Sequence, residues 1–406
     1  MFLKIISLGW KNVWRNPTRS GVVVVAVLLG VWAGVFLSAF MNGMAQGYLQ
    51  NQLNLSVGHI QIMHPRFEDQ FNPTCEIPDA DKVIDRLEAE SHVTEIRPQS
   101  LSTGLAQSAS NSYGVSIHGI NSKTDSTNPV QQYLVEGDML QGVSRNPVVI
   151  GRELAERLDL DLKSRMVLSF QDVNGNITAG AFRVAGIFDS PNNNYDNSNV
   201  FVEATDLNSL LEKEDLTHKI TLKVDDFGQA ERYAQQLASQ FPNLNVTSWG
   251  DIAPELRYVY SVMDVTLYIF MVIIVIALVF SIINTMLMAI LERTRELGML
   301  MAVGMNKVRL FMMILSETVF LTMTGAPLGL LCSWISIDLL KETGINLSAF
   351  AEGLNAYGMS TVIYPEIEAI YYLNIALMIA VAALLSSLYP AWKTLKLKPV
   401  EAIRKI

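Results

Sequence analysis

The side chains of this chain that could perform chemistry are few and widely spaced. The sequence contains five histidines, and His59 and His64 stand five positions apart, so that in a strand their side chains would face opposite sides. No third metal ligand lies near either of them in the sequence. The chain has no glycine-rich loop ending in Gly-Lys-Ser/Thr and no Gly-x-Ser-x-Gly motif. The sequence therefore predicts no metal site, no cofactor and no catalytic role for this chain.

The segment 292–311 is the part of the chain whose residue pattern most clearly suggests a function. It reads ERTRELGMLMAVGMNKVRLF, which is typical of a short helix that is polar first and apolar later. Its charged residues are two acids and four bases: Glu292, Glu296, Arg293, Arg295, Lys307 and Arg309. Between the charged ends lies an apolar patch bounded by two glycines: Leu297, Gly298, Leu300, Met301, Val303 and Gly304. A simple connecting loop would not need such a patch.

Long apolar runs flank this segment on both sides. At about 1.5 Å per residue, Leu267–Leu291 and Met312–Ile337 are each long enough to cross a hydrocarbon layer of roughly 30 Å. Two more runs, Gly21–Phe40 and Tyr371–Leu388, have the same character. The sequence therefore predicts four membrane spans.

The charge distribution predicts on which side of the membrane each part lies. The ends are basic, with Lys4 and Arg15 among the residues before the first span, and Lys393 and Arg404 among those after the last. Short cytoplasmic segments carry the excess of Lys and Arg, so both termini and the segment 292–311 are expected inside. Residues 41–264 hold 30 acidic and 16 basic residues, a net charge of −14 against −9 for the whole chain. This acidic outer domain argues against binding of nucleic acid.

Residues 58–247 are expected to form an α+β extracytoplasmic domain with two lobes. Strand patterns occur near 59–64, 94–97, 113–120 and 219–224, and helical patterns near 81–90 and 228–240. A β-rich insert near 100–200 would form the second lobe, with a short helix at 153–158 and a turn at Asn174-Gly175-Asn176. The helical patterns of spans one and two continue outward as stalks, so that one stalk leads directly into the segment 292–311.

The predicted fold class is thus an α-helical membrane domain of four spans plus an α+β outer domain. Its parts are a cytoplasmic interfacial helix (1–20), span one with its stalk (21–57), the outer domain (58–247), a stalk with span two (248–291), a short cytoplasmic helix (292–310), span three (311–337), an outer loop (338–370), span four (371–388) and a cytoplasmic tail (389–406).

Three stretches of the sequence resemble one known family. The run NTMLMAILERTRELGMLMAVG, residues 284–304, is similar to the second span and coupling helix of the MacB/FtsX-like permeases, the membrane subunits of type VII ABC transporters. The tail YPAWKTLKLKPVEAIR, residues 389–404, and the N-terminal residues 10–34 are similar to the ends of that family. The resemblance implies a pair of ATPase subunits that bind ATP and Mg²⁺, a second permease subunit, identical or paralogous, and a location in the bacterial inner membrane.

The resemblance also implies which residues contact the ATPase. In the family the short cytoplasmic helix docks into a groove of the ATPase, which here assigns the coupling role to Glu292, Arg295, Glu296, Leu297, Gly298, Met301, Ala302 and Gly304.

The sequence leaves more than one class of cargo open. The strand GHIQIM, residues 58–63, most resembles the LolC/LolE branch, which implies release of lipoproteins from the outer leaflet. Efflux of a drug, toxin or peptide with a periplasmic adaptor, as in MacB, is one alternative, although MacB chains usually carry their own ATPase. An FtsX-like relay to an extracellular hydrolase is another alternative, and a receptor unrelated to ABC transporters is a more remote one.

Two sets of residues within the spans also suggest function. Glu317 and Asn284 are polar residues in apolar runs, where an ionisable group is costly and marks a site or a buried contact; Arg19 and Arg293 are the candidate partners of Glu317. Flexible or aromatic side chains gather near the outer ends of spans one and two, where they could receive lipid or acyl chains: Phe36, Phe40, Met41, Met44, Met263, Leu267, Phe270 and Met271. Ordinary helix packing would explain this second set equally well.

Overall fold

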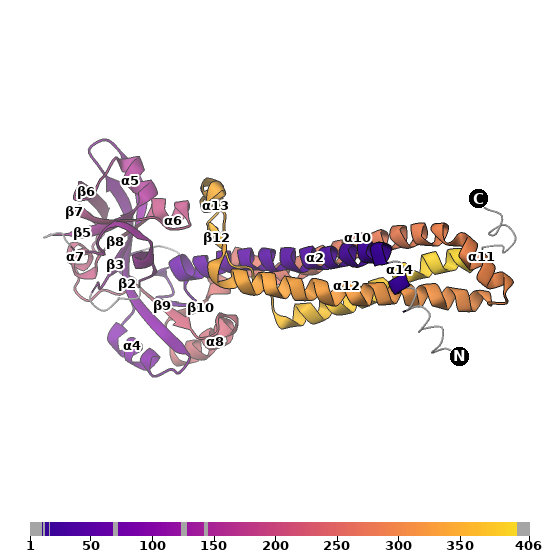
Figure 1. Ribbon diagram of the computed structural model, residues 1–406. Coiled ribbons are helices and arrows are strands. Elements are labelled where there is room, and N and C mark those ends of the chain that lie inside the picture. Colours follow the sequence, from indigo (N-terminus) through magenta and orange to yellow (C-terminus); the bar gives the residue numbers. More distant parts are fainter. Residues whose placement is uncertain are drawn as a thin grey trace. The chain divides into compact units, whose positions relative to one another are not determined.

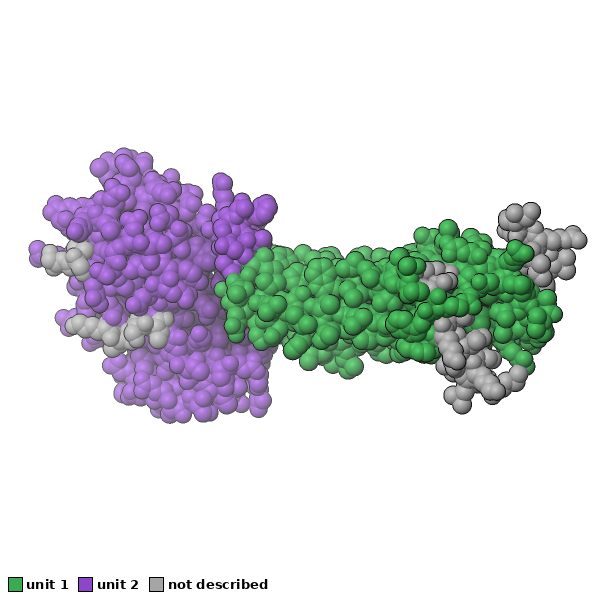
Figure 2. Space-filling model, viewed as in Figure 1, with its two compact units in different colours: residues 1–45, 262–345, 363–406 green, residues 46–261, 346–362 purple. Residues whose placement is uncertain are grey.

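The computed structural model describes residue 10 and residues 13–15, 17–67, 72–122, 128–141 and 145–395. Within these residues the chain divides into two compact units, coloured separately in Figure 2. Unit 1 comprises residues 1–45, 262–345 and 363–406, and unit 2 comprises residues 46–261 and 346–362. Most of the predicted interfacial helix (1–20) and the tail from residue 396 onward lie outside the described residues.

The described part of unit 1 is built from long helices. Four of the helices described are long and apolar enough to cross a membrane, and they are labelled in Figure 1: α2 (Pro17–Gln52), α10 (Pro254–Glu292), α12 (Lys307–Thr343) and α14 (Ala369–Leu395). A shorter helix, α11 (Thr294–Ala302), joins α10 to α12. Each long helix extends beyond its apolar run, because helical hydrogen bonding does not need an apolar sequence and continues into the polar flanks. Both α2 and α10 contribute residues to both units.

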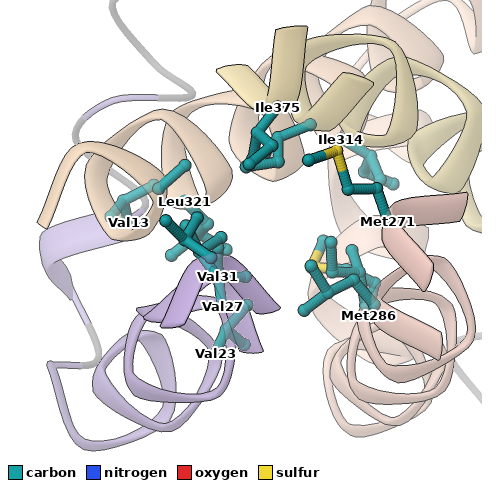
Figure 3. Close-up of a cluster of buried hydrophobic side chains, with 14 of the residues drawn as sticks. Val13, Val23, Val27, Val31, Met271, Met286, Ile314, Leu321 and Ile375 are labelled. Carbon is teal, nitrogen blue, oxygen red and sulfur yellow. The ribbon is translucent and has the colours of Figure 1, made fainter. Parts of the chain in front are cut away.

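The core of unit 1 lies between the faces of these helices that turn away from lipid. On α2 the buried residues Val23, Val27 and Val31 recur every fourth position, so they form one stripe along the helix (Figure 3). Met271 of α10 and Leu321 of α12 belong to the same cluster. Many other side chains of these helices are exposed in the isolated chain, as expected where lipid or another protein covers them.

Glycines allow α2 to approach two neighbouring helices closely. A Cβ atom at Gly329 of α12 would lie 2.7 Å from the carbonyl oxygen of Leu28, and one at Gly34 of α2 would lie 2.9 Å from the side chain of Ile274 in α10. Such contacts are typical of helices that pack through small residues four positions apart, a spacing that Gly325 also has to Gly329.

Unit 2 is organised by a ten-stranded mixed sheet. The strands are β1 (Ile60–Met63), β2 (Val93–Gln107), β3 (Ser112–Ile120), β4 (Leu134–Gly137), β5 (Pro147–Gly151), β6 (Arg165–Gln171), β7 (Ile177–Phe188), β8 (Asn199–Glu203), β9 (Lys219–Val224) and β10 (Asn245–Ser248). Their order is β10-β1-β9-β2-β3-β8-β5-β7-β4, with β6 paired to β2 and β7. The pairs β3–β8 and β5–β7 are parallel, and the other pairs are antiparallel.

Helices cover this sheet in two groups, which define two lobes. The first lobe has α4 (Ala80–Glu88), α8 (Ala230–Gln240) and the short α9 (Trp249–Ile252), and the second has α5 (Arg152–Leu158), α6 (Asn193–Ser198) and α7 (Ala204–Leu210). The long strand β2 serves both lobes, because Ile96 packs against the core of the first lobe and Ala106 is buried in that of the second.

Short elements complete the described fold. A π-helical turn, η1 (Leu53–Val57), follows α2 and ends at Gly58, whose φ of +71° is readily adopted by glycine. The remaining turns are η2 (Pro129–Tyr133), η3 (Phe227–Gln229) and η4 (Ser348–Phe350). Between α12 and α14 the chain forms β11 (Ile345–Asn346), α13 (Ala351–Ala356) and β12 (Val362–Ile363).

The predicted fold class is confirmed: four helices of membrane-spanning length among the described residues accompany a mixed α/β domain. The strand pattern near 94–97 is the start of a strand that runs to Gln107. The strands β8 and β10 and the helices α6 and α7 have no counterpart in the sequence prediction. Each is at most seven residues long, so it contains too few apolar residues for their spacing to indicate a helix or a strand.

Candidate functional site at the junction of α10, α11 and α12

Arg293 links three helices at the point where α10 turns into α11. Its Nη1 atom lies 3.2 Å from Oε1 of Glu317 in α12, and its Nε atom lies 3.2 Å from Oε2 of Glu296 in α11. The Arg293 and Glu317 side chains are 12% and 9% exposed, so this ion pair is shielded from solvent. Of the two partners expected for Glu317, the structure places Arg293 beside it; the side chain of Arg19 lies outside the described residues.

The second carboxylate of this network is at the surface. Glu296 is paired with both Arg293 and Arg15, and its side chain is 47% exposed. Burial by itself would raise the pKa of Glu296, but the hydrogen bonds from Arg293 and Arg15 outweigh it and hold that pKa below its ordinary value. The carboxylate therefore stays charged at neutral pH and connects α11 to the helical turn at residues 13–15.

One face of α11 is fixed into unit 1 and the opposite face is exposed. Leu297 is 3% exposed and belongs to the unit 1 core, and Gly298 is buried as well. Thr294 adds hydrogen bonds from its hydroxyl to the carbonyl oxygens of Ile290 and Leu291, at 3.0 and 2.9 Å. These contacts hold the start of α11 against the end of α10.

The exposed face of α11 is apolar. Met299 is 49% exposed, Leu300 is 36% exposed and Val303, directly after the helix, is 89% exposed. Their spacing of three and four residues places them on one side of the helix. Sequence reasoning included Leu300 and Val303 in the patch but missed Met299. The helical period separates Leu297 and Met301 from these three residues, and the structure shows that the face of Leu297 and Met301 is the inner one.

The end of α11 is shaped by a glycine and a cap. Gly304 has a φ of +104°, a conformation that glycine adopts without the steric penalty of a side chain. Two residues later the side chain of Asn306 accepts a hydrogen bond from the backbone N–H of Val308 and caps the start of α12. Lys307 donates a hydrogen bond of 2.8 Å to the carbonyl oxygen of Leu395, at the end of α14.

The residues predicted for ATPase coupling are thus divided between two environments. Leu297 and Gly298 are buried in unit 1, and Met301 is half-buried against the same core. The other predicted residues are exposed: Glu292, Arg295, Glu296, Ala302 and Gly304. Their contact with an ATPase stays a prediction, and the structure indicates that Leu297 and Gly298 would act by positioning α11.

The residues predicted to receive lipid are not gathered around one pocket. An apolar pocket of about 20 Å³ lies between α2, α10 and α14, and Gly34, Met271 and Ile379 are among its lining residues. Of the predicted residues, Met271 lines it and the others do not. Leu267 and Met271 are core residues with 2% and 3% exposure, whereas the other six are half-buried: Phe36, Phe40, Met41, Met44, Met263 and Phe270. A lipid role for them stays a prediction. Asn284 of the predicted polar pair is exposed on α10.

Among the described residues, no group of three or more His, Cys, Asp or Glu side chains could hold a metal ion. Three histidines are instead buried in unit 2 and hydrogen-bonded: His59, His118 and His218. Burial lowers the pKa of each of these three side chains.

Two protein-family models match this chain. The model of the MacB-like periplasmic core domain matches residues 20–240, which is more than half of the chain, and the model of the FtsX-like permease C-terminal domain matches residues 268–399. The second match contains the junction of α10, α11 and α12.

Curated relatives carry names from both branches. The chain is 30% identical over 124 residues to the macrolide export ATP-binding/permease protein MacB of Chlorobium luteolum, a match that covers 30% of this chain and 16% of that protein. It is 24% identical over 277 residues to the lipoprotein-releasing system transmembrane protein LolC of Xylella fastidiosa, which covers 63% of this chain and 64% of that protein. With LolE of Haemophilus influenzae it shares 21% identity over 78% of this chain and 79% of that protein. The chain thus spans less than two thirds of the length of the first two.

A solved structure of the periplasmic region of MacB from Actinobacillus actinomycetemcomitans aligns with 52% of this chain and 97% of its own, at 15% identity and a TM-score of 0.36. The two family matches, residues 20–240 and 268–399, each include residues of both units. The chain therefore belongs to the MacB/FtsX-like family of ABC-transporter permeases, with a MacB-like periplasmic core domain and an FtsX-like C-terminal domain.

Proposed function

We propose that this chain is the membrane subunit of an ABC transporter in the bacterial inner membrane. In this proposal a separate pair of ATPase subunits binds ATP and Mg²⁺ on the cytoplasmic side, and the chain converts their motion into movement of the outer domain. Two permease subunits, identical or paralogous, would serve the two ATPase subunits. Membership of the permease family supports the class, and the architecture of α10 and α11 supports the mechanism.

The observation that carries the proposal is the pairing of a long rigid helix with a clamped short one. Helix α10 runs for 39 residues, about 58 Å at 1.5 Å per residue, and contributes to both units. Directly after it, Arg293 ties α11 to Glu317. A push on α11 would therefore be passed to the end of α10 and not absorbed by a flexible loop.

The exposed apolar face of α11 supplies the contact in this proposal. Met299, Leu300 and Val303 form a patch at the surface that has no cover within the described residues of this chain. Burying such side chains against a partner gains roughly 1.5–3 kcal/mol for each one that becomes fully covered. The exposed charges of Arg295 and Glu296 beside the patch would set the register of docking.

The docking experiment uses lysine substitutions on the exposed face of α11, with a control at an exposed apolar position in α12. We expect Met299→Lys and Val303→Lys to abolish copurification of the ATPase from native membranes while the permease still inserts. Val308→Lys is the matched control, because Val308 is 62% exposed at the start of α12 but lies outside α11. Normal copurification and ATP turnover with both α11 variants would show that this face is not the docking site.

For the cargo, we propose that the chain releases lipoproteins from the outer leaflet of the inner membrane. The match to LolC covers 63% of this chain and supports this branch. Efflux of a small molecule or peptide with a periplasmic adaptor is the second candidate, since the match to MacB is shorter but has the higher identity of 30%.

The cargo experiment is purification of the native complex in mild detergent, followed by mass spectrometry of its proteins and lipids. Lipid-modified proteins that accompany an ATPase would support release. An ATPase with an adaptor would instead support efflux, and an ATPase with a cell-wall hydrolase and no cargo would indicate a relay. Recovery of the permease without any ATPase, under conditions that preserve other ABC complexes, would contradict the whole proposal.

A further inference from the structure

A polar cavity of about 190 Å³ lies within unit 2 and has no assigned role. Its floor is formed by β9, β2 and β3, and the turn η1 and helix α6 contribute residues to its walls. A cavity of this size holds several water molecules or one small polyatomic ion, because a single water needs only about 10–15 Å³ of such space. All of its lining residues belong to unit 2, so the cavity depends on this unit alone.

The register of the sheet gathers the polar residues on one face. Arg97 and Gln99 are two positions apart on β2, so their side chains point to the same side. Thr221 of β9 pairs with Arg97, and Lys219 of β9 pairs with Gln99. On the other neighbour of β2, His118 of β3 pairs with Leu101, which is again on that face. A buried sheet face normally carries apolar side chains, and this one carries two cations and a histidine.

The two cations in the cavity are poorly compensated. Lys219 is 9% exposed as a residue, and its ammonium group, which is not among the fully shielded atoms, has no hydrogen-bond or ion-pair partner among the described residues. Arg97 is 7% exposed, and its Nε atom lies 3.3 Å from a carboxylate oxygen of Glu95 without forming a well-aligned hydrogen bond. Burial and the neighbouring Arg97 together lower the pKa of Lys219 to about 8, so the group is still mainly charged at pH 7. An unpaired buried cation is costly unless an anion or water solvates it.

His118 is a lining residue of the same cavity and has an unfilled hydrogen-bond acceptor. The Asn199 amide nitrogen donates to the carbonyl oxygen of Tyr195 at 2.9 Å, which fixes the amide so that its Oδ1 faces His118 Nε2 at 2.8 Å. Nε2 must therefore carry the proton, and Nδ1 is left as a bare acceptor. Nδ1 is buried and has no hydrogen-bond partner. Burial lowers the pKa of His118 to about 3, so this nitrogen does not fill its lone pair by binding a proton at neutral pH.

We propose that this cavity binds a phosphate group that keeps one proton, either a hydrogen phosphate ion or the monoanion of a phosphate monoester. Lys219 and Arg97 neutralise its charge, and Nδ1 of His118 accepts the hydrogen bond from its remaining hydroxyl. Charge-assisted hydrogen bonds from a Lys and an Arg are the usual means of holding such a group. The proposal concerns unit 2 alone and does not depend on the transport function.

The acceptor on His118 should make the cavity selective for phosphate over anions that carry no proton. A sulfate ion has the same size and charge as hydrogen phosphate but carries no proton at neutral pH. It would leave Nδ1 unpaired and place an oxygen lone pair against it, which is repulsive. A phosphate diester, as in most phospholipid head groups, lacks the proton in the same way. The cavity should therefore prefer phosphate to sulfate.

The test is calorimetric titration of the full-length chain in detergent at pH 7 and constant ionic strength, with three probes. Sodium phosphate should bind, and sodium sulfate should bind at least about tenfold more weakly, the equivalent of one lost buried hydrogen bond. The third probe, sn-glycerol 3-phosphate, distinguishes the sources. With a second pKa of about 6, only about a tenth of this monoester keeps its phosphate proton at pH 7. Binding within about tenfold of phosphate therefore assigns a monoester, and much weaker binding assigns the free ion. Either of two results overturns the proposal: sulfate binds as tightly as phosphate, or no phosphate binding is detected up to roughly 10 mM phosphate.

Two pairs of variants locate the binding. Lys219→Gln should weaken phosphate binding about tenfold or more, whereas Lys223→Gln, the same change on the same strand but outside the cavity lining, should leave it unchanged. If Lys219→Gln does not fold, Thr103 offers an exposed position in the lining. There Thr103→Glu should weaken binding through charge repulsion, and the neutral Thr103→Gln should have little effect. Equal binding by the two members of the pair that folds would show that phosphate binds elsewhere.

Discussion

The Arg293 guanidinium lies 3.2 Å from the Glu317 carboxylate, which ties the residue between α10 and α11 to the third long helix. The same arginine also reaches the exposed Glu296. One side chain therefore meets a buried and an exposed carboxylate, which makes the contribution of each separately measurable.

Loss of the buried carboxylate should destabilise unit 1 far more than loss of the exposed one. Glu317→Gln leaves the Arg293 charge shielded from solvent and without its main counter-charge, and we expect a loss of about 3 kcal/mol in the free energy of unfolding. Glu296→Gln is the matched control, with an expected loss below about 1 kcal/mol because that pair is exposed. Thermal and denaturant unfolding of the purified chain in detergent measures both. Equal losses would mean that the buried pair is not the stronger support.

The two faces of α11 should respond differently to truncation. Leu297→Ala removes a core side chain and should cost about 2–4 kcal/mol of stability, whereas Leu300→Ala, on the exposed face, should cost less than about 0.5 kcal/mol. In an ATPase-binding assay the order should reverse for any variant that stays folded, because only Leu300 is available to a partner. Similar stability losses from the two substitutions would contradict the orientation of α11.

Two glycines one turn apart on α2 should differ in their tolerance of alanine. A Cβ atom at Gly43 would lie 2.1 Å from the carbonyl oxygen of Tyr364, whereas one at Gly47 would meet no other atom within 4 Å. We expect Gly43→Ala to destabilise the protein by about 1–3 kcal/mol through the clash. Gly47→Ala should stabilise it by roughly 0.5–1 kcal/mol, because alanine favours the helix. Unfolding midpoints of the two variants give the comparison, and a Gly43→Ala protein as stable as wild type would show that this close contact is absent.

The contact at Gly43 has support from neighbouring hydrogen bonds. The side-chain amide of Asn42 donates to the carbonyl oxygen of Glu366 at 2.9 Å, and the backbone N–H of Glu366 donates to the carbonyl oxygen of Ala39 at 3.2 Å. The segment before α14 is therefore held against α2 at several points, so it cannot move aside to make room for a methyl group at low cost.

Acid should destabilise unit 2 through His118. Burial lowers the pKa of this imidazole from 6.5 to about 3 in the folded protein. The unfolded chain therefore binds a proton that the folded protein does not, so stability is fully present above pH 6.5 and falls as the pH drops from 6.5 towards 3. The slope approaches about 1.4 kcal/mol per pH unit in that range.

Comparison of wild type with His118→Gln isolates this effect. The variant has no imidazole at this position, so the difference in unfolding free energy between the two proteins should change between pH 6.5 and 4 and be constant above pH 7. The comparison is needed because Asp196 acts in the opposite direction: burial raises its pKa to about 7, so its contribution is lost as the pH rises through that value. A difference that does not vary with pH would show that His118 is not shielded.

Much of this protein is determined by its sequence alone. The four apolar runs are long enough that only a membrane can accommodate them, and the charge asymmetry distinguishes their flanks, so the fold class follows from composition and length. The family follows from the local run at residues 284–304 because its charged and small residues are contiguous. The residues predicted to contact an ATPase come from the same run, since they lie within thirteen positions.

The tertiary structure decided which of those residues face outward. A helix of nine residues presents both faces within a few positions, and the sequence contains no indication that Leu297 rather than Met299 meets the core. The partner of Glu317 was also open between two arginines until α10 and α12 were placed side by side.

The polar cavity could not be predicted from the sequence. Arg97, His118 and Lys219 come from three strands, with Arg97 and Lys219 lying 122 positions apart, and each looks like an ordinary polar residue in an alternating strand. Only the register of β9, β2 and β3 puts them on one buried face. Local periodicity specifies elements, whereas the meeting of distant side chains is specified by strand pairing, which no local pattern records.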